Sequence, residues 1–447
     1  MTTQTLNLSL ETVAALSDYH DEPAWMRAAR QAAWAQYAAL PLPSAQDEAW
    51  RRTPPGRFPL ETARIKLAHK PVDDLSELPP CWHQTMAPES QVAGSLVHCD
   101  GRLAYRAAQP RLEAQGVVFA DLHAALREHS ELIRRHWMRG EIARPDFNKF
   151  TALHAALWTS GTFVYAPAGA RVERPLQTLT AYNGEGGAGL HHTLLIAEAG
   201  SRVTLLQDRI SQEAGPELNA DVVEIYAEAG AWVRYVSLQH WGEQRYAVSV
   251  QEAHLQRDAN LVWVNAALGS RVSKEFLRSN LTAPGARALM HGFTFAHAGQ
   301  QLDQSTYQHH QAPETFSDLL YRNVLRDTAR TVFYGMIRVE PGAQGTEGYQ
   351  ANHNLLLVPP GVEVKPRAHA IPGLEIWAND VRCSHGATVS RLDPEQLFYL
   401  QARGLPRPQA ESLIVEGFLR PIVERVPLAK LRERLGEEIG RRFWEKG

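Results

Sequence analysis

The pattern of apolar and polar residues changes twice along the chain. In the middle third, short runs rich in Val, Leu, Tyr and Thr alternate with Gly-Ala turns, and no helical run of ten or more residues intervenes. The turn glycines Gly169, Gly200 and Gly230 follow one another at 31 and 30 residues. Self-similarity at such a period is typical of repeat architectures. The pattern favours a parallel β-helix or another β-solenoid over a two-sheet sandwich, which needs hairpin turns at closer intervals.

The residues before this region show the spacing of apolar residues that is typical of helices. Apolar residues from Trp25 to Leu40 recur at steps of three and four, between Pro23 and Pro41, which predicts a helix. Residues 96–105 form two short β-prone runs around Asp100-Gly101, a dipeptide that favours a tight hairpin turn. We therefore expect a mainly helical N-terminal domain with a small hairpin over residues 1–145.

Helical patterns return after residue 391. Asp393 and Pro394 offer a helix start, and Gly404 offers a stop. A final apolar stripe at helical spacing consists of Leu428, Leu431, Leu435, Ile439 and Phe443. This stripe either covers the end of the solenoid or receives a partner helix. The chain is thus divided into 1–145, a β-helix core over 146–391, and a C-terminal helical domain over 392–447.

Composition narrows the functional classes. The chain has 447 residues, 44% of them hydrophobic, and a net charge of -3, so no global field attracts nucleic acid or anionic lipid. The longest uncharged run, 150–170, contains His154, Gly161 and Pro167, which favours a core segment over a membrane span. The N-terminus shows no secretory signal pattern. With only three cysteines in the chain, we expect a cytoplasmic, reducing environment.

The three cysteines are Cys81, Cys99 and Cys383, and no two form a C-x-x-C pair. They cannot form a four-thiolate cluster site by themselves. On a strand, however, Cys383 and His385 share one face, which makes a half-site for a soft metal. Completing it requires ligands from another chain or another coil. The alternative is a buried cysteine beside a hydrogen-bonded histidine.

Other chemistry is less well supported. No G-x-x-x-x-G-K-[ST] stretch exists, so any ATP hydrolysis by a P-loop belongs to a partner. Carboxylates in the middle third are scattered singly, whereas glycoside hydrolysis needs an opposed pair. A β-helix enzyme acting on polysaccharide and a metal-free solenoid binding module remain as alternatives.

Several longer stretches resemble the SufB/SufD family of iron-sulfur cluster assembly scaffolds, and within it the SufD-like chains. The matching stretches are 348–350, 354–357, 371–376, 380–389 and 395–404, with 50–53, 161–165 and 175–177 in the N-terminal half. The SufD-like feature is Cys383-Ser384-His385-Gly386-Ala387-Thr388, together with the helical N-terminal region. Asn379-Asp380 departs from the two acidic residues common there.

This resemblance implies a right-handed parallel β-helix between two helical domains, and a scaffold that is not an enzyme. It implies pairing with a SufB-like subunit through the β-helix, with His385 and Cys383 at that interface as ligands of a transient iron-sulfur cluster. It also implies docking of a SufC-like ATPase through the C-terminal helices. The expected docking residues are Leu397, Phe398, Tyr399, Leu428, Leu431 and Leu435. No stably bound cofactor is expected on the isolated chain, for which homodimerisation stays open.

Overall fold

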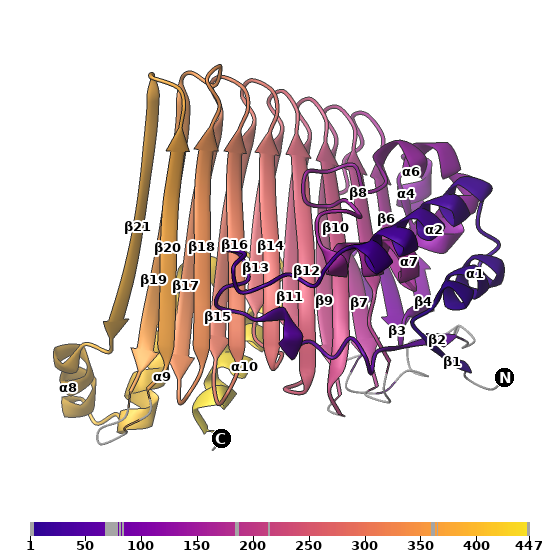
Figure 1. Cartoon of the computed structure of the whole chain (residues 1–447). Coiled ribbons are helices and arrows are strands. Elements are labelled where there is room, and N and C mark those ends of the chain that lie inside the picture. Colours follow the sequence, from indigo (N-terminus) through magenta and orange to yellow (C-terminus); the bar gives the residue numbers. More distant parts are fainter. Residues whose placement is uncertain are drawn as a thin grey trace.

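The computed structural model describes residues 4–67, 79, 82, 85–183, 187–212, 215–358, 363 and 365–444. It shows a β-solenoid with helices near both ends of the chain (Figure 1), which confirms the predicted fold class. Each coil contributes one strand to each of two sheets, and each strand pairs in parallel with the strand one coil away.

The even-numbered strands from β6 onward belong to a nine-stranded sheet. In spatial order it contains β20 (Arg367–Ile376), β18 (Arg330–Val339), β16 (Gln301–His310), β14 (Val272–Leu281), β12 (Arg245–Leu255), β10 (Glu217–Ala227), β8 (His191–Ala197), β6 (Ser160–Ala166) and β5 (Val118–Asp121). The last pair, β5 and β6, is antiparallel.

The second sheet has ten strands. In spatial order it contains β21 (Val381–Arg391), β19 (Thr346–Leu357), β17 (Phe316–Arg326), β15 (Arg287–Ala296), β13 (Asn260–Ala267), β11 (Trp232–His240), β9 (Arg202–Ser211), β7 (Leu176–Tyr182), β3 (Gly94–Cys99) and β4 (Arg102–Ala108). The predicted hairpin around Asp100-Gly101 is confirmed as β3 and β4, with both turn residues at positive φ. Strands β3, β4 and β5 extend the two sheets, although the sequence placed them in the N-terminal domain.

The repeated Gly-Ala turns stack on one another. Gly169, Gly200 and Gly230 have φ values of 73°, 67° and 66°, a region that glycine reaches without steric cost. The Gly169 N–H donates to the Ala199 carbonyl and the Gly200 N–H to the Ala229 carbonyl, both at 2.9 Å. Each turn thereby donates a backbone hydrogen bond to the turn of the next coil. This stacking fixes the coil period seen in the sequence.

The N-terminal region forms several helices at one end of the solenoid. They are α1 (Leu10–Tyr19), α2 (Ala24–Ala39), α4 (Pro110–Ala114), α5 (Leu122–Glu128), α6 (Ser130–His136) and α7 (Lys149–Leu157), with 3-10 turns at Pro55–Arg57 and Glu89–Gln91. Strands β1 (Gln4–Asn7) and β2 (Arg64–Leu67) pair apart from the solenoid. The predicted helix between Pro23 and Pro41 is confirmed as α2.

The N-terminal chain also crosses the outer face of the nine-stranded sheet, where Figure 1 shows it passing over the strands. Trp50 stacks on Phe150 and packs against Phe276 of β14. Below it, Lys274 and Asp303 form a buried ion pair at 2.7 Å. This face of the solenoid is therefore covered by the chain itself.

The C-terminal helices are α8 (Pro394–Ala402), α9 (Arg407–Val423) and α10 (Ala429–Trp444). Apolar residues of α9 and α10, among them Leu419 and Leu435, pack on Phe293 and Phe295 of β15. The terminal stripe does pack on the solenoid, but it covers the outer face of the ten-stranded sheet and not the end of the solenoid, where the sequence placed it.

Buried charges fix α10 on this face. The His240 imidazole lies 2.9 Å from an Asp208 carboxylate oxygen and 2.9 Å from one of Glu438. Burial alone would lower the pKa of His240, but the two carboxylates raise it to about 9. Arg434 also pairs with Asp208. A protonated histidine between two carboxylates thus joins α10 to β9 and β11.

On the opposite sheet, a chain of buried hydrogen bonds has a defined direction. His154 Nδ1 is 2.7 Å from the Ala220 carbonyl, which only accepts, so Nδ1 carries the proton. Burial lowers the pKa of both His154 and His192, so each ring is neutral and has one bare nitrogen. His192 therefore donates from Nδ1 to His154 Nε2 at 3.0 Å, and its Nε2 accepts from Glu224 at 3.1 Å.

Glu224 must then carry a proton at neutral pH. Burial raises its pKa to about 8, in agreement with this direction. A carboxyl whose pKa is raised by folding stabilises the fold less as pH rises from its ordinary value of 4.5 through 8. The Met138 N–H also donates to this carboxyl, at 2.9 Å. The loss of stability at higher pH should therefore weaken the contact between the solenoid and the segment that follows α6.

We predict that Glu224→Gln removes this pH dependence. The amide retains a donor for His192 but loses the acceptor for the Met138 N–H, so the variant should be less stable than wild type at pH 5. The difference should shrink toward pH 8.5, as the wild type loses stability on the order of a few kcal/mol. Denaturant unfolding at several pH values measures this, and parallel pH profiles for the two proteins would contradict it.

Candidate functional site

The last coil of the solenoid is open. Strands β20 and β21 are the outermost strands of their sheets, and in Figure 1 no described helix lies across them. Side chains of β21 are mostly exposed, whereas the described strands in the middle of the same sheet are mostly buried. One edge of an eleven-residue strand is thus free to pair.

The structure places Cys383 and His385 in the row of β21 that faces the solenoid interior. Cys383 pairs in register with Gly348 of β19, and His385 pairs with Gln350. The Cys383 side chain is half-buried and packs near Ile337, in the interior of the preceding coil. His385 follows two residues later and is exposed, because no further coil covers it. The thiol and the imidazole therefore share one face at the open end.

These two side chains could supply two ligands to a metal. Burial raises the pKa of the Cys383 thiol, although a hydrogen bond with the Gly348 backbone acts in the opposite direction. Binding a soft metal would therefore displace a proton from sulfur. Among the described residues, no group of three or more His, Cys, Asp or Glu could hold a metal ion. A cluster at this end would need ligands from another chain.

Gln350 is a member of this site that the sequence reasoning did not single out. Its side chain lies on the interior face one coil before His385 and is 3% exposed. The available signal was the spacing, since Gly348 precedes Cys383 by 35 residues and Gln350 precedes His385 by the same number. Only the register of β19 and β21 shows that this spacing places Gln350 directly beside His385 on the neighbouring strand.

The other cysteines lie elsewhere. Cys99 is buried among Val97, Tyr105 and Leu179, and burial raises its pKa far above the ordinary range. This agrees with a structural role. Cys81 lies outside the described residues.

The residues expected to dock an ATPase fall into two groups. On α8, Phe398 and Tyr399 are 73% and 57% exposed, while Leu397 is buried. Leu431 and Leu435 are buried against the solenoid, and Leu428 packs partly against the same core. In this structure the second group packs α10 on the solenoid, so Leu431 and Leu435 offer little surface to a partner, whereas Leu428 is half-buried. Docking of an ATPase through these residues stays a prediction.

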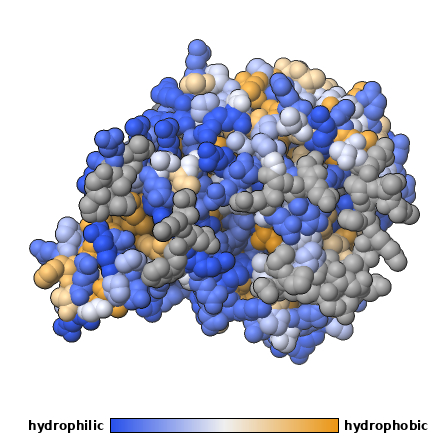
Figure 2. All heavy atoms as spheres, turned by 90° about the horizontal axis from the view of Figure 1, so that it is seen from below, coloured by the Kyte–Doolittle hydropathy of each residue, from blue (hydrophilic) through white to orange (hydrophobic). Residues whose placement is uncertain are grey.

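Seen from below, apolar side chains gather on the lobe at the left, where α8 lies (Figure 2). A hollow of about 390 Å³ lies between α8, α9 and the solenoid, lined by Phe398, Leu357 and Phe443 among others. This lobe is the part of the C-terminal region most open to a partner.

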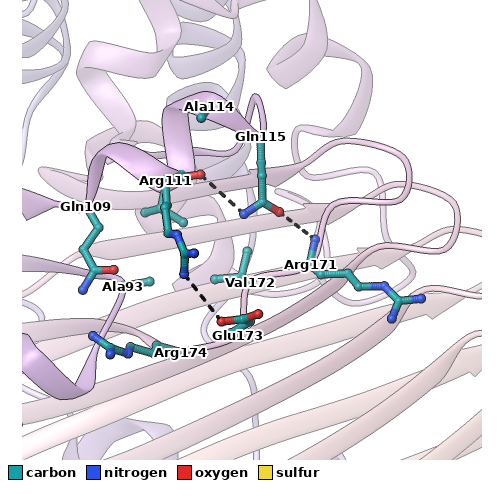
Figure 3. A pocket seen from close by; sticks show the side chains of 10 residues that line it. Ala93, Gln109, Arg111, Ala114, Gln115, Arg171, Val172, Glu173 and Arg174 are labelled. Carbon is teal, nitrogen blue, oxygen red and sulfur yellow. Dashed lines mark hydrogen bonds and ion pairs between the residues drawn. The ribbon is translucent and has the colours of Figure 1, made fainter.

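A larger hollow, of about 520 Å³, lies near the opposite end of the solenoid (Figure 3). Arg111, Arg171 and Arg174 line it, but their guanidinium groups point in different directions. Arg111 faces Glu173 at 3.9 Å, with both side chains highly exposed. Seven strand positions separate β7 from β21, or about 34 Å, so this hollow has no part in the half-site.

Two carboxylates of the solenoid interior each have a polar partner. Asp221 lies 3.4 Å from Arg209, and Glu275 accepts from Asn265 at 2.9 Å. Each of these two carboxylates thus has its own partner.

None of the described helices is long and apolar enough to cross a membrane.

Comparison with known proteins identifies the family. The model of the SUF system FeS cluster assembly SufBD core domain matches residues 180–418, more than half of the chain. The model of the SufBD protein N-terminal region matches residues 88–178. The predicted family is therefore confirmed, whereas SufD rather than SufB stays a prediction.

Curated relatives agree over nearly the whole length. The iron-sulfur cluster assembly protein SufB of Bacillus subtilis is 27% identical over 429 residues, covering 94% of this chain and 90% of that protein. An iron-sulfur cluster assembly SufBD family protein of Staphylococcus saprophyticus is also 27% identical, and one of Staphylococcus epidermidis is 26% identical, with the same coverage.

Proposed function

Because the chain belongs to the SufBD family of iron-sulfur cluster assembly proteins, we propose that it is a SufD-like, non-enzymatic scaffold subunit. Its cargo is a nascent iron-sulfur cluster, bound transiently at the open end of the solenoid. The observation that carries this proposal is an incomplete ligand set, Cys383 and His385, on the interior face of an edge strand whose outer side has no partner strand. The low cysteine content fits a cytoplasmic location.

The two edge strands differ in their capacity to pair. Strand β20 contains Pro372, which lacks a backbone donor and is typical of edge strands that stay unpaired. Strand β21 contains no proline and presents a continuous row of backbone donors and acceptors. We therefore place a SufB-like partner on β21, where it would supply the missing ligands. In the absence of that partner, the same edge is available to a second copy of this chain.

The proposed ATPase contact is on α8. Phe398 and Tyr399 are two exposed aromatic side chains, and aromatic residues are enriched in protein interfaces. Only Leu392 and Asp393 separate the end of β21 from the start of α8 (Figure 1). A movement of α8 driven by a SufC-like ATPase would therefore be transmitted directly to the strand that carries the half-site.

For the half-site, we predict that His385→Ala impairs cluster assembly without unfolding the protein. His385 is exposed, so its removal should change the melting temperature by little. Maturation of an iron-sulfur enzyme in cells with the variant as the only copy should fall at least tenfold. Normal maturation would contradict the assignment of this site. Ser390→Ala, an exposed residue on the opposite face of the same strand, is the matched control.

For the ATPase contact, we predict that Phe398→Asp weakens binding of the ATPase, whereas Leu435→Asp destabilises the fold. Phe398 is exposed, so the charge should weaken co-purification of the ATPase while leaving thermal unfolding unchanged. Leu435 is fully buried, so a charge there should destabilise the fold by roughly 3 kcal/mol or more. Retention of the ATPase by Phe398→Asp, in a complex of normal stability, would exclude α8 as the contact.

A further inference from the structure

The coil directly beneath the open end of the solenoid contains a buried side-chain amide without a hydrogen-bond partner. Gln350 is 3% exposed, yet neither its Nε2 nor its Oε1 has a hydrogen-bond partner in the described structure. A buried amide in this state costs stability, and most buried polar groups are paired. The arrangement therefore needs an explanation other than packing.

The fold reserves space for this side chain. A Cβ on Gly335 of β18 would lie 2.5 Å from Gln350 Nε2 and 2.7 Å from Oε1. The Gln350 side chain therefore crosses the interior of its coil and lies on the bare backbone of the opposite sheet. In the last coil, Pro372 stands beside Gly335 and lacks an N–H that could donate to the amide.

His385 is the residue above Gln350 in the same interior row. The two are in register on neighbouring parallel strands, one strand spacing or about 4.8 Å apart. The neighbours of His385 in its own row are Cys383 and Ala387, and neither side chain offers an oxygen acceptor. A metal-bound histidine almost always donates its second ring N–H to such an acceptor.

We propose that Gln350 is a positioning residue for His385, whose ring, turned inward, donates one N–H to the Gln350 Oε1. This hydrogen bond would fix the tautomer and leave the other ring nitrogen for iron of the cluster under assembly. The inference rests on the proposed function, since it assigns a role to Gln350 only if His385 is a ligand. Gly335 contributes to the same arrangement, because the absence of a Cβ there leaves room for the Gln350 amide.

Two variants test this in different ways. Gln350→Met preserves length and removes the acceptor, whereas Gly335→Ala retains the amide and displaces it. Gly335 is not at positive φ, so alanine is compatible with its backbone. The matched control is Gln251→Met, since Gln251 is a fully buried interior glutamine with an unpartnered Oε1, three coils away on β12.

The experiment uses the full chain in its complex with the SufB-like and SufC-like subunits, supplied with ferrous iron and sulfide. We expect Gln350→Met and Gly335→Ala to slow cluster formation 10- to 100-fold, roughly the cost of losing such an outer partner. The melting temperature of Gln350→Met should be unchanged or higher, whereas a purely structural role predicts a lower one. Gln251→Met should assemble clusters at the wild-type rate.

A cryo-EM structure of the wild-type complex gives a direct readout. We expect Gln350 Oε1 within about 3.2 Å of a His385 ring nitrogen. Wild-type rates in both variants, or a ring turned away from Gln350, would overturn the inference while leaving the role of His385 intact if His385→Ala is still impaired. If His385→Ala also assembles clusters normally, the proposed function itself fails.

Discussion

The structure depends on one constraint: every strand of the solenoid must pair with the strand one coil away. Parallel, in-register pairing satisfies the backbone of all coils but the outermost, and it stacks equivalent side chains in continuous rows. At one end, the strands β4 and β5 and the N-terminal helices complete the sheets. At the other end, β20 and β21 have no successor, and the half-site lies in the row that this leaves uncovered.

Long-range polar contacts fasten the flanking segments to the solenoid, and each has a defined charge state. The Ala220 carbonyl sets the direction of a chain of neutral groups that ends at a protonated Glu224. On the other face, His240 is protonated because it lies between Asp208 and Glu438. Two buried histidine sites thus hold opposite protonation states at neutral pH. The difference comes from their neighbours, since burial alone disfavours the charged form at both.

Several features of the site were accessible from local pattern and resemblance. The two-residue spacing places Cys383 and His385 on one strand face in any β-structure, and three cysteines already imply an incomplete site. Gln350 was not accessible in this way, because 35 residues is not the 30- or 31-residue period of the early coils. The apolar stripe containing Leu435 was predicted correctly as buried or docked, but periodicity does not identify the surface that covers it.

By itself, the sequence determined the repeat, the helical flanks and the family, because turn glycines, strand-forming runs and helix signals act over a few residues. The tertiary structure decided which coil is last and uncovered, which helices lie on the solenoid, and which interior side chain lies beneath His385. These depend on strand register and on contacts between residues far apart in the chain. Local propensity carries no information about such contacts, since they arise only when the coils stack.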